Sequence, residues 1–290
     1  MAALWYDERV ITCARRVSGS LLTVLLLVVF AAAGPASGAA NLTVMSFNIW
    51  LQGSHGGTGV VADWIRASGA NVVALSETGG GATEAIADAL GWQHTGSGGE
   101  LDVISALPIE ETDWKSSNDT GAQAIAAKIA GVWVYSIHLD YTNYGPTNAC
   151  FDKVSVSTIL AGESTRRSQA EQIAEWTGNR PVIVAGDLNS PSHQDWTAGA
   201  AALHCGYTVD WPTTRAFTNR GFTDSFRQLR PDPVAEPGNT WSPVVKDDPQ
   251  DRIDYLFYRG DAITPTSTRT FGGGDGWPSD HLAVISSFTV

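Results

Sequence analysis

Apolar and polar residues alternate in short segments along most of the chain, and the segments have the lengths of strands and helices. Strands are expected at 42–49, 71–76, 102–104, 124–129, 132–138, 181–185, 253–258 and 282–290. Helical spacing of apolar residues predicts helices at 60–68, 83–90 and 164–176. Glycine-rich stretches at 79–81, 96–99 and 272–276 mark loops. Strand-rich alternation without a glycine fingerprint favours a mixed α/β sandwich over a nucleotide-binding doubly wound sheet.

The first forty residues have a different character. Arg9, Arg15 and Arg16 precede an almost unbroken apolar run at 21–33, and small residues follow at 37–40. This is the layout of a secretory signal peptide. The run is shorter than the roughly 20 residues of a membrane-spanning helix, although an uncleaved anchor is the alternative. We expect residues 1–40 to be a signal peptide and 41–290 to form one catalytic domain of a secreted protein.

The remaining domain is acidic. Removing three of the 18 basic residues and two of the 30 acidic ones leaves a net charge of −13. A protein that binds nucleic acid by neutralising phosphates usually has a basic face, and the composition does not suggest one. The charge fits a soluble secreted protein. It does not exclude a nucleic-acid substrate, because several of the acids belong to the candidate site described below.

Two cysteines remain after the signal segment, Cys150 and Cys205. In an oxidising compartment, a lone pair is most simply a disulfide. A zinc site is disfavoured because His204 and the distant acids do not make a compact ligand pattern. We therefore expect Cys150 and Cys205 to be bonded to each other.

Polar residues interrupt the apolar strands at their ends. They are Asn48, Glu77, His138, Asp187, Asn189, Asp254, Asp280 and His281. An ionised side chain that faces a core is costly unless it is paired or bound to a metal. One such residue is usually a structural hydrogen-bonding group. Repetition at six strand ends favours a shared site where the strand ends converge.

The residue types at these positions suit one class of reaction. Carboxylate and amide oxygens are hard ligands that bind magnesium, calcium or manganese. Imidazoles donate to a phosphate oxygen or move protons near neutral pH. The sequence has no serine nucleophile elbow, no phosphate-binding P-loop and no Cys-x-x-Cys motif. The chemistry indicated is attack of water on phosphorus, with a metal and imidazoles stabilising the added charge.

The ordered set of motifs resembles that of the endonuclease/exonuclease/phosphatase superfamily, which includes DNase I, abasic-site endonucleases, bacterial sphingomyelinases and inositol phosphatases. The motifs are Ser46-Phe47-Asn48, Leu75-Ser76-Glu77, Ile137-His138-Leu139, Gly186-Asp187-Leu188-Asn189, Arg252-Ile253-Asp254-Tyr255 and Ser279-Asp280-His281. The resemblance extends over 42–290. It implies a single-domain, DNase I-like α/β fold, a four-layer α/β/β/α sandwich.

The resemblance also implies a metal site. Glu77 resembles the principal metal ligand, with Asn48 beside it, and Asp280 would be a second carboxylate of the site. Mg²⁺ is the expected cation, with Mn²⁺ or Ca²⁺ as alternatives.

Further roles follow from the same resemblance. Asp187 would orient the attacking water and Asn189 would bind the phosphate. His281 resembles the catalytic histidine, with Asp254 holding its tautomer. His138 would face the phosphate, and which histidine is the general base stays open.

The loop after His138, residues 140–146, departs from the corresponding part of DNase I and of the sphingomyelinases. Tyr141 and Tyr144 in this loop are expected to contact the substrate. Trp241 is a candidate for stacking on the substrate, with core packing as the alternative.

Four charged positions outside the motifs have simpler interpretations. Arg166 and Arg167 are expected to be solvated helix charges. Asp251 is expected to form a surface ion pair with Arg252. Asp224 has two interpretations, a contact with the site or an N-cap.

We expect a secreted, metal-dependent phosphoester hydrolase, a phosphodiesterase or a phosphatase, that acts on a small phosphoester, a lipid headgroup or a nucleic acid. The narrower alternatives are an extracellular endonuclease of the DNase or RNase type and a sphingomyelinase-like phospholipase. An inactive binding module on the same fold is the alternative outside enzymes. The protein is expected to be a monomer without a stable protein partner.

Overall fold

The structure is a computed structural model that describes residues 40–290. The expected signal peptide lies almost wholly outside these residues. Within them, no helix is long and apolar enough to cross a membrane.

Twelve strands and nine short helices make up the described part of the chain. The strands are β1 (Asn41–Asn48), β2 (Val72–Ser76), β3 (Gln93–His94), β4 (Leu101–Ser105), β5 (Glu111–Ser116), β6 (Gln123–Ile129), β7 (Val132–His138), β8 (Val182–Asp187), β9 (Thr223–Asp224), β10 (Asp254–Arg259), β11 (Thr264–Phe271) and β12 (Ala283–Thr289). The helices are α1 (Trp50–Gly53), α2 (Thr58–Ser68), α3 (Ala82–Leu90), α4 (Gly145–Cys150), α5 (Val156–Gly162), α6 (Ser164–Trp176), the 3₁₀-helix η1 (Ala198–His204), α7 (Pro212–Thr218) and α8 (Ser225–Leu229).

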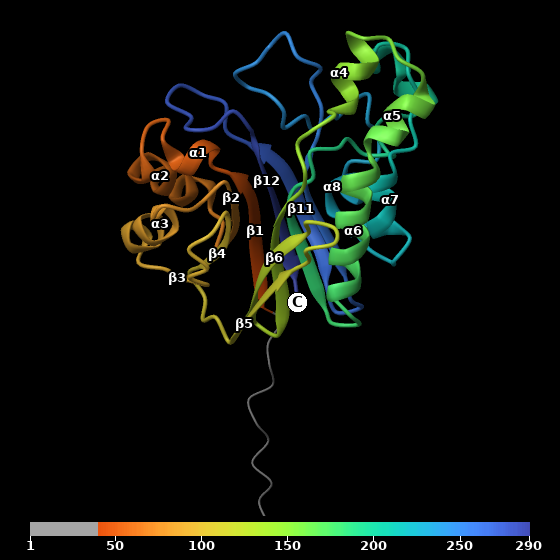
Figure 1. Ribbon diagram of the computed structural model, residues 1–290. Helices are drawn as coiled ribbons and strands as arrows, with labels where there is room; N and C mark the ends of the chain where they lie inside the picture. The colour runs from red at the N-terminus through yellow and green to blue at the C-terminus, as the bar shows by residue number, and fades with distance from the viewer. Residues whose placement is uncertain (1–39) are drawn as a thin grey trace, which may run out of the picture. The chain divides into compact units, whose positions relative to one another are not determined.

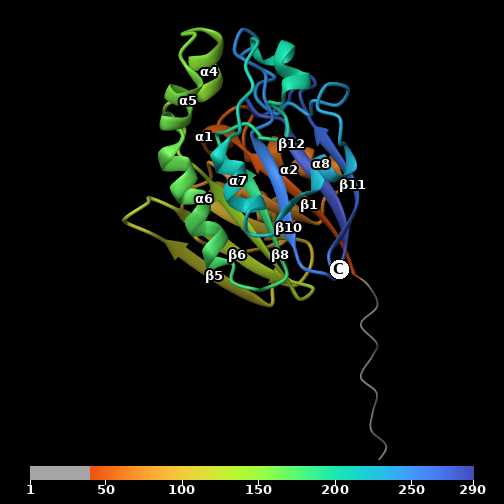
Figure 2. The ribbon, with the colours of Figure 1, turned by 90° about the vertical axis from the view of Figure 1, so that its right-hand side faces the viewer.

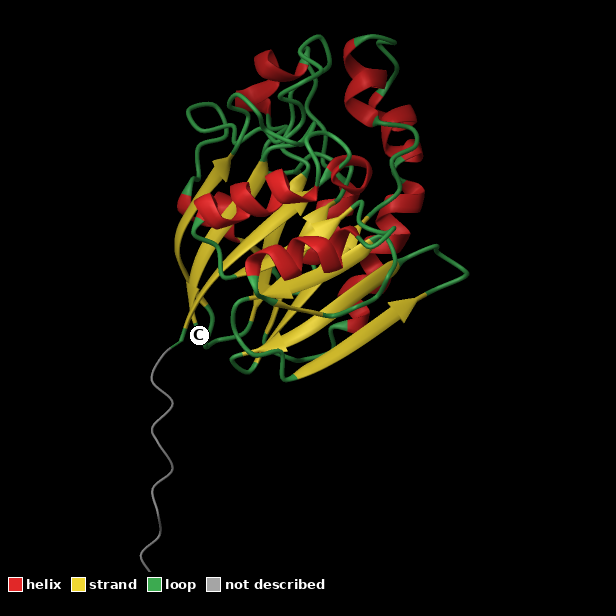
Figure 3. Ribbon diagram, turned by 90° about the vertical axis from the view of Figure 1, so that its left-hand side faces the viewer, coloured by secondary structure: helices red, strands yellow, loops and turns green. Residues whose placement is uncertain are grey.

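The strands form two six-stranded sheets, which are seen together in Figure 3. The first has the order β11-β12-β1-β2-β4-β3 and the second β5-β6-β7-β8-β10-β9. Each sheet contains one parallel pair at its centre, β1 with β2 and β7 with β8, and its other pairs are antiparallel. The sheets are mixed because a helix follows the first strand of each parallel pair, as a parallel crossover requires.

The sheets pack face to face, and helices cover both outer faces, α2 and α3 on one side and α6 and α7 on the other (Figures 1 and 2). The side chains of β1 alternate between two cores, which explains the layered arrangement. Leu42 and Val44 point into the core between the sheets, whereas Met45 and Phe47 point into the core under α2 and α3. A third core lies between the second sheet and α6 and α7. The predicted four-layer α/β/β/α sandwich is therefore confirmed.

Strand register brings the polar strand ends together. His138, the last residue of β7, is opposite Asp187, the last residue of β8. Asp254, the first residue of β10, is opposite Asp187 on its other side. In the first sheet, Asn48 at the end of β1 is opposite Ser76, the residue before Glu77. Because both parallel pairs end at the same edge of the sandwich, their polar ends form one site.

All the predicted strands and helices are present, and the sequence patterns missed several short elements. Strands β5 and β11 lie at sheet edges, where polar residues outnumber apolar ones. Strong apolar alternation is not needed at an edge that faces water. Helices α4, α5, α7 and α8 have at most seven residues, too few to show a period by themselves.

Candidate active site

Two histidines approach one carboxylate oxygen at the centre of the site. Nε2 of His281 and Nε2 of His138 each lie 3.6 Å from Oδ2 of Asp187. The other ring nitrogen of each histidine contacts a second carboxylate. Nδ1 of His281 is 2.9 Å from Oδ2 of Asp254, and Nδ1 of His138 is 2.8 Å from Oε1 of Glu100. Each imidazole therefore lies between Asp187 and a carboxylate of its own.

These carboxylates control the protonation of both imidazoles. Burial disfavours the charged form of His281, but Asp254 and Asp187 outweigh it and raise its pKa to about 10. Burial also opposes the charge on His138, but the hydrogen bond that its ring donates to Glu100 and the charge of Asp187 raise its pKa. Burial raises the pKa of Asp254, against the effect of His281. Both rings can therefore carry a proton toward an anionic group bound at Asp187.

Glu100 was not among the predicted site residues. It follows a glycine-rich loop and precedes β4, so the sequence marks it only as a loop acid. Its side chain is 56% exposed, and its hydrogen bond to His138 lowers its own pKa. Only the packing of the two sheets brings this loop to the end of β7. Glu100 supports His138 as Asp254 supports His281.

Asn48 links Glu77 to Asp187. Its Nδ2 donates to Oε1 of Glu77 at 3.0 Å and to Oδ2 of Asp187 at 3.2 Å. Its Oδ1 accepts the backbone N–H of Trp50 at 2.9 Å. The other oxygen of Glu77, Oε2, accepts the backbone N–H of Leu51 at 2.7 Å. Both predicted ligands are therefore at the site, with the amide N–H of Asn48 directed at the two carboxylates.

The backbone around Glu77 is strained. Left-handed φ values occur at Trp50 (51°), Leu51 (48°), Gln52 (63°) and Glu77 (58°). Such angles are unfavourable for residues with a Cβ atom and persist only where the surrounding structure enforces them. Here they direct the N–H of Leu51 toward the Glu77 carboxylate.

Asn189 completes the arrangement around His138. Its φ of 49° is left-handed, and its backbone N–H donates to Oδ1 of Asp187 at 2.8 Å. Its Nδ2 donates to the carbonyl of Leu139 at 3.0 Å and lies 3.1 Å from Nε2 of His138. The predicted phosphate ligand is thus beside the phosphate-facing imidazole.

The donor atoms fit a divalent cation. Three potential ligand atoms lie within 4.8 Å of one another, one each from Asp187, Asp254 and His281. Oδ1 of Asp254 and Oδ1 of Asp280 are buried and have no hydrogen-bond partner among residues 40–290. Burial, and to a smaller extent the charge of Glu77, raise the pKa of Asp280 to about 6. Unpaired buried carboxylate oxygens are what a hard cation would satisfy.

A hollow of about 510 Å³ opens beside these groups and is lined by Glu77, Glu100 and His138. Its rim includes Leu51 and Tyr141, which are 60% and 74% exposed. Glycines at 79, 98 and 99, together with Gln52 and Thr78, line the rest of the wall. The hollow is the approach to the site, which below is called the catalytic hollow.

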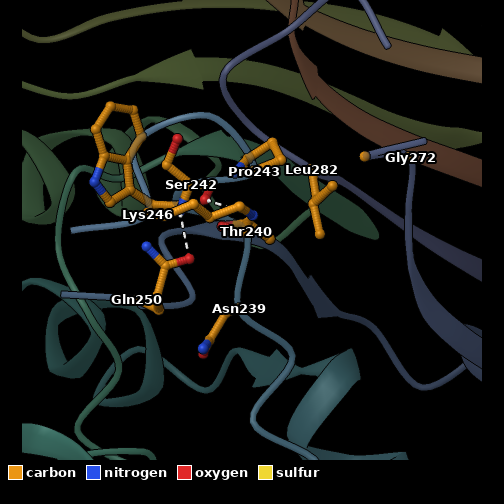
Figure 4. A pocket seen from close by; sticks show the side chains of 10 residues that line it. Asn239, Thr240, Ser242, Pro243, Lys246, Gln250, Gly272 and Leu282 are labelled. Atoms are coloured by element: carbon orange, nitrogen blue, oxygen red, sulfur yellow. Dashed lines mark hydrogen bonds between the residues drawn. The ribbon is translucent and has the colours of Figure 1, made fainter. Parts of the chain in front are cut away.

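The other two predicted substrate contacts lie elsewhere. Tyr144 is outside the lining of the catalytic hollow, and its hydroxyl is 3.5 Å from Oδ2 of Asp251. Trp241 packs edge-on against His281, with ring centroids 5.0 Å apart. It also lines a separate hollow of about 250 Å³, in which Figure 4 shows Lys246, Gln250 and Asn239. Contact of Tyr144 or Trp241 with the substrate stays a prediction.

The expectation of a solvated Arg166 was wrong. This residue is 1% exposed, and its Nε donates to Oε1 of Glu163 at 2.9 Å. Its guanidinium also donates to the carbonyls of Asp140 at 3.1 Å and Asn143 at 2.9 Å. Arg167, its neighbour, is exposed as expected and pairs with Glu171. The helical spacing alone does not reveal that Arg166 faces the loop after His138.

The expected surface pair of Asp251 and Arg252 was also wrong. Asp251 is 2% exposed and accepts a hydrogen bond from Nε1 of Trp196 at 2.7 Å. Burial raises its pKa to about 7. Arg252 instead pairs with Asp195 and Asp224. Asp224 is the N-cap of α8, the second of its two interpretations.

The predicted disulfide is present. It joins Cys150 at the end of α4 to Cys205 after η1, with Cα atoms 5.4 Å apart. It therefore fixes the segment that follows the loop at 140–146 to the segment that follows the Asp187 motif.

The two-sheet sandwich and its cluster of carboxylates and imidazoles define a class, the metal-dependent phosphoric ester hydrolases. The sequence profile of the Endonuclease/Exonuclease/phosphatase family matches residues 45–281. The chain belongs to this family. An uncharacterized protein of Caenorhabditis elegans is 31% identical over 290 aligned positions, which cover 86% of this chain and 91% of the relative.

Solved structures share the fold at low identity. TDP2 of D. rerio, complexed with a single-strand DNA product, has a TM-score of 0.61 and 16% identity, and the match covers 87% of this chain and 100% of that one. An AP endonuclease from Archaeoglobus fulgidus has a TM-score of 0.58 and 17% identity, with 86% and 100% covered. At this identity, the similarity shows the fold alone.

Proposed function

We propose that the protein is a secreted phosphodiesterase that hydrolyses its substrate by direct attack of water on phosphorus. One observation carries the proposal: His138 and His281 reach the same Asp187 oxygen at 3.6 Å from two sides, each with its own carboxylate. A diester with an alkoxide leaving group needs one group to take a proton from water and another to return a proton to the leaving oxygen. Two supported imidazoles meet this need.

The residues act on protons and on phosphoryl oxygens. Asp254 fixes the tautomer of His281 through Nδ1, so Nε2 faces the reacting centre. Glu100 does the same for His138. Asp187 orients the attacking water between them, and the amide of Asn189 holds a phosphoryl oxygen.

A divalent cation, Mg²⁺ with Mn²⁺ or Ca²⁺ as alternatives, would neutralise charge on the phosphoryl oxygens. Glu77 and Asp280 would hold it, because Oδ1 of Asp280 has no other partner in the described part of the chain and Glu77 faces the catalytic hollow. The compact group of Asp187, Asp254 and His281 is the alternative ligand set. We favour the first set because the hydrogen bond to His281 already explains the position of Asp254.

A small diester is favoured over a long nucleic acid. The net charge of −13 for residues 41–290 does not attract a polyanion, and the two carboxylates that line the catalytic hollow would repel neighbouring phosphates. A nuclease is the second candidate. The similarity to a TDP2 with bound DNA product and to an AP endonuclease favours it.

The test compares bis-p-nitrophenyl phosphate with p-nitrophenyl phosphate in Mg²⁺, with and without EDTA. A diesterase cleaves the first faster, loses this activity in EDTA, and in H₂¹⁸O places one ¹⁸O on phosphorus. Faster cleavage of the monoester would make the protein a phosphatase. Nicking of plasmid DNA at a higher kcat/KM would favour the nuclease, and no cation-dependent hydrolysis at all would favour a binding module.

Secretion and a monomeric state are part of the proposal. The signal-peptide pattern at 1–40 and the Cys150–Cys205 disulfide both suit an oxidising, extracellular compartment. N-terminal sequencing of protein from culture medium should give a first residue near 40. Light scattering should give the mass of one chain. Retention of residues 1–40 in a membrane fraction would contradict secretion.

A further inference from the structure

A second hollow, of about 190 Å³, lies beside the catalytic hollow. Glu100, His138 and Tyr141 line both hollows, so the two hollows adjoin at these side chains. The wall away from His138 is formed in part by Gln123, Asp140 and Gln169. A substrate whose phosphorus lies at His138 would therefore reach the second hollow with one of its ester arms.

Gln169 supplies an amide donor there. It comes from α6 and is only 7% exposed. Its Oε1 accepts the backbone N–H of Asp140 at 2.9 Å, but none of the hydrogen bonds within residues 40–290 uses its Nε2. A Cβ atom placed on Gly121 would lie 3.5 Å from this nitrogen. The amide N–H₂ is thus held on the wall of the hollow, next to a residue without a side chain, where it can donate to a bound group.

The charges around the hollow select the ligand. Glu100 and Asp140 both line it, so a second phosphate or a carboxylate would meet two like charges. A hydroxyl group suits the wall because it accepts from the amide of Gln169 and donates to a carboxylate. Neutral arms that carry hydroxyl groups are the chemical class that fits.

The wall is preformed. The carboxylate of Asp140 accepts the backbone N–H of Thr142 at 2.9 Å, and Arg166 donates to the carbonyls of Asp140 and Asn143. Tyr141 lies within this fixed loop. A site held in advance loses little freedom when a ligand binds.

We propose that the second hollow is a subsite for a neutral, hydroxyl-bearing arm of the phosphodiester, recognised by Gln169. The proposal rests on the proposed function and narrows its substrate class to diesters of polyols, such as glycerol-like or sugar-like groups.

The test uses two chromogenic diesters with the same leaving group, methyl p-nitrophenyl phosphate and 2,3-dihydroxypropyl p-nitrophenyl phosphate. The protein should prefer the dihydroxypropyl ester by roughly fivefold to tenfold in kcat/KM, mainly through KM, which is the effect of about one or two neutral hydrogen bonds. Gln169→Glu keeps the oxygen that accepts from Asp140 and removes the donor. This substitution should bring the ratio of kcat/KM for the two esters close to one. It should leave kcat/KM for the methyl ester within about twofold of that of the unmodified protein.

Gln172→Glu is the control, because it makes the same change of charge on α6 outside the hollow. If Gln169→Glu does not fold, Gln123→Ala takes its place, since Gln123 is exposed on β6 and lines the same hollow. An unchanged ratio in the folded variant, or no preference in the unmodified protein, overturns the subsite. Failure to cleave either ester in Mg²⁺ refutes instead the diesterase activity on which the subsite rests.

Discussion

His138 lies opposite Asp187 across the parallel strands β7 and β8, and its Nε2 is 3.6 Å from Oδ2 of that carboxylate. The pairing is a direct consequence of register, because both residues are the last of their strands. On the other side of β8, Asp254 is opposite the same Asp187 and supports His281. The register of β8 with its two neighbouring strands therefore sets the positions of both imidazoles.

The two imidazoles should both be essential. We expect His138→Ala and His281→Ala each to lower kcat by about a hundredfold or more, because general acid–base groups contribute at least that much. His193→Ala is the control, since its Nδ1 contacts Thr214 away from the site. Steady-state kinetics with bis-p-nitrophenyl phosphate measures the effect. Near-normal turnover in either variant would contradict the assignment.

Glu100 should raise the pKa of His138. Replacing Glu100 with Gln removes the carboxylate that stabilises the imidazolium, so the pKa of His138 should fall and the ring should lose its proton at a lower pH. Titration followed by NMR in cation-free protein measures this directly. Glu111→Gln, on the exposed strand β5, should leave the pKa of His138 unchanged. An equal pKa in Glu100→Gln and the unmodified protein would rule out the supporting role.

Cation binding should depend on Glu77. Glu77→Gln should weaken Mg²⁺ binding about tenfold or more in calorimetry, because a charged ligand becomes neutral. Glu84→Gln on α3 is the matched control. Asp254→Asn distinguishes the two ligand sets, because it should reduce kcat more than it reduces cation affinity. The opposite result, with Asp254→Asn losing the cation and Glu77→Gln retaining it, would favour the set of Asp187, Asp254 and His281.

Asp251 should make stability depend on pH. Its pKa in the folded protein is about 7, above the value near 4 of an unfolded aspartate, so the folded state holds the proton more tightly. The contribution of Asp251 to the free energy of unfolding is most favourable below pH 4, and it is lost as the pH rises from about 4 to 7. The rise of the pKa from about 4 to about 7 corresponds to a loss on the order of 4 kcal/mol in the free energy of unfolding.

Asp251→Asn should remove this dependence, because the amide still accepts from Trp196 and does not ionise. The free energy of unfolding in urea at pH 4 and pH 8 gives the comparison. A difference between the two pH values that is the same in the variant and the unmodified protein would mean that Asp251 is ionised at little cost.

Arg166 and Arg167 are adjacent in sequence and should differ greatly in their effect. Arg166→Ala leaves Glu163 buried without its cation and should lower the free energy of unfolding by about 3–5 kcal/mol. Arg167→Ala removes one exposed ion pair with Glu171 and should change the free energy of unfolding by less than about 1 kcal/mol. Equal effects in urea unfolding would show that Arg166 is solvated after all.

The local sequence determined the elements that carry the chemistry. Apolar alternation along β1, β2, β7 and β8 fixes buried strands, and a polar residue that ends such a strand has a functional or structural cause. For that reason Asn48, His138 and Asp187 were found from the pattern alone. The disulfide followed from having only two cysteines after the signal segment.

Only the tertiary structure decided which other side chains meet these strand ends. Glu100 and Arg166 lie in segments whose local pattern is that of an exposed loop and an amphipathic helix, yet one contacts His138 and the other holds residues 140–143. Asp251 is buried beside Trp196, Tyr144 and His204, which come from distant segments that no pattern around Asp251 indicates. Periodicity shows which side of its own helix or strand a residue lies on. The contacts of Glu100, Arg166 and Asp251 depend instead on how distant elements pack against each other.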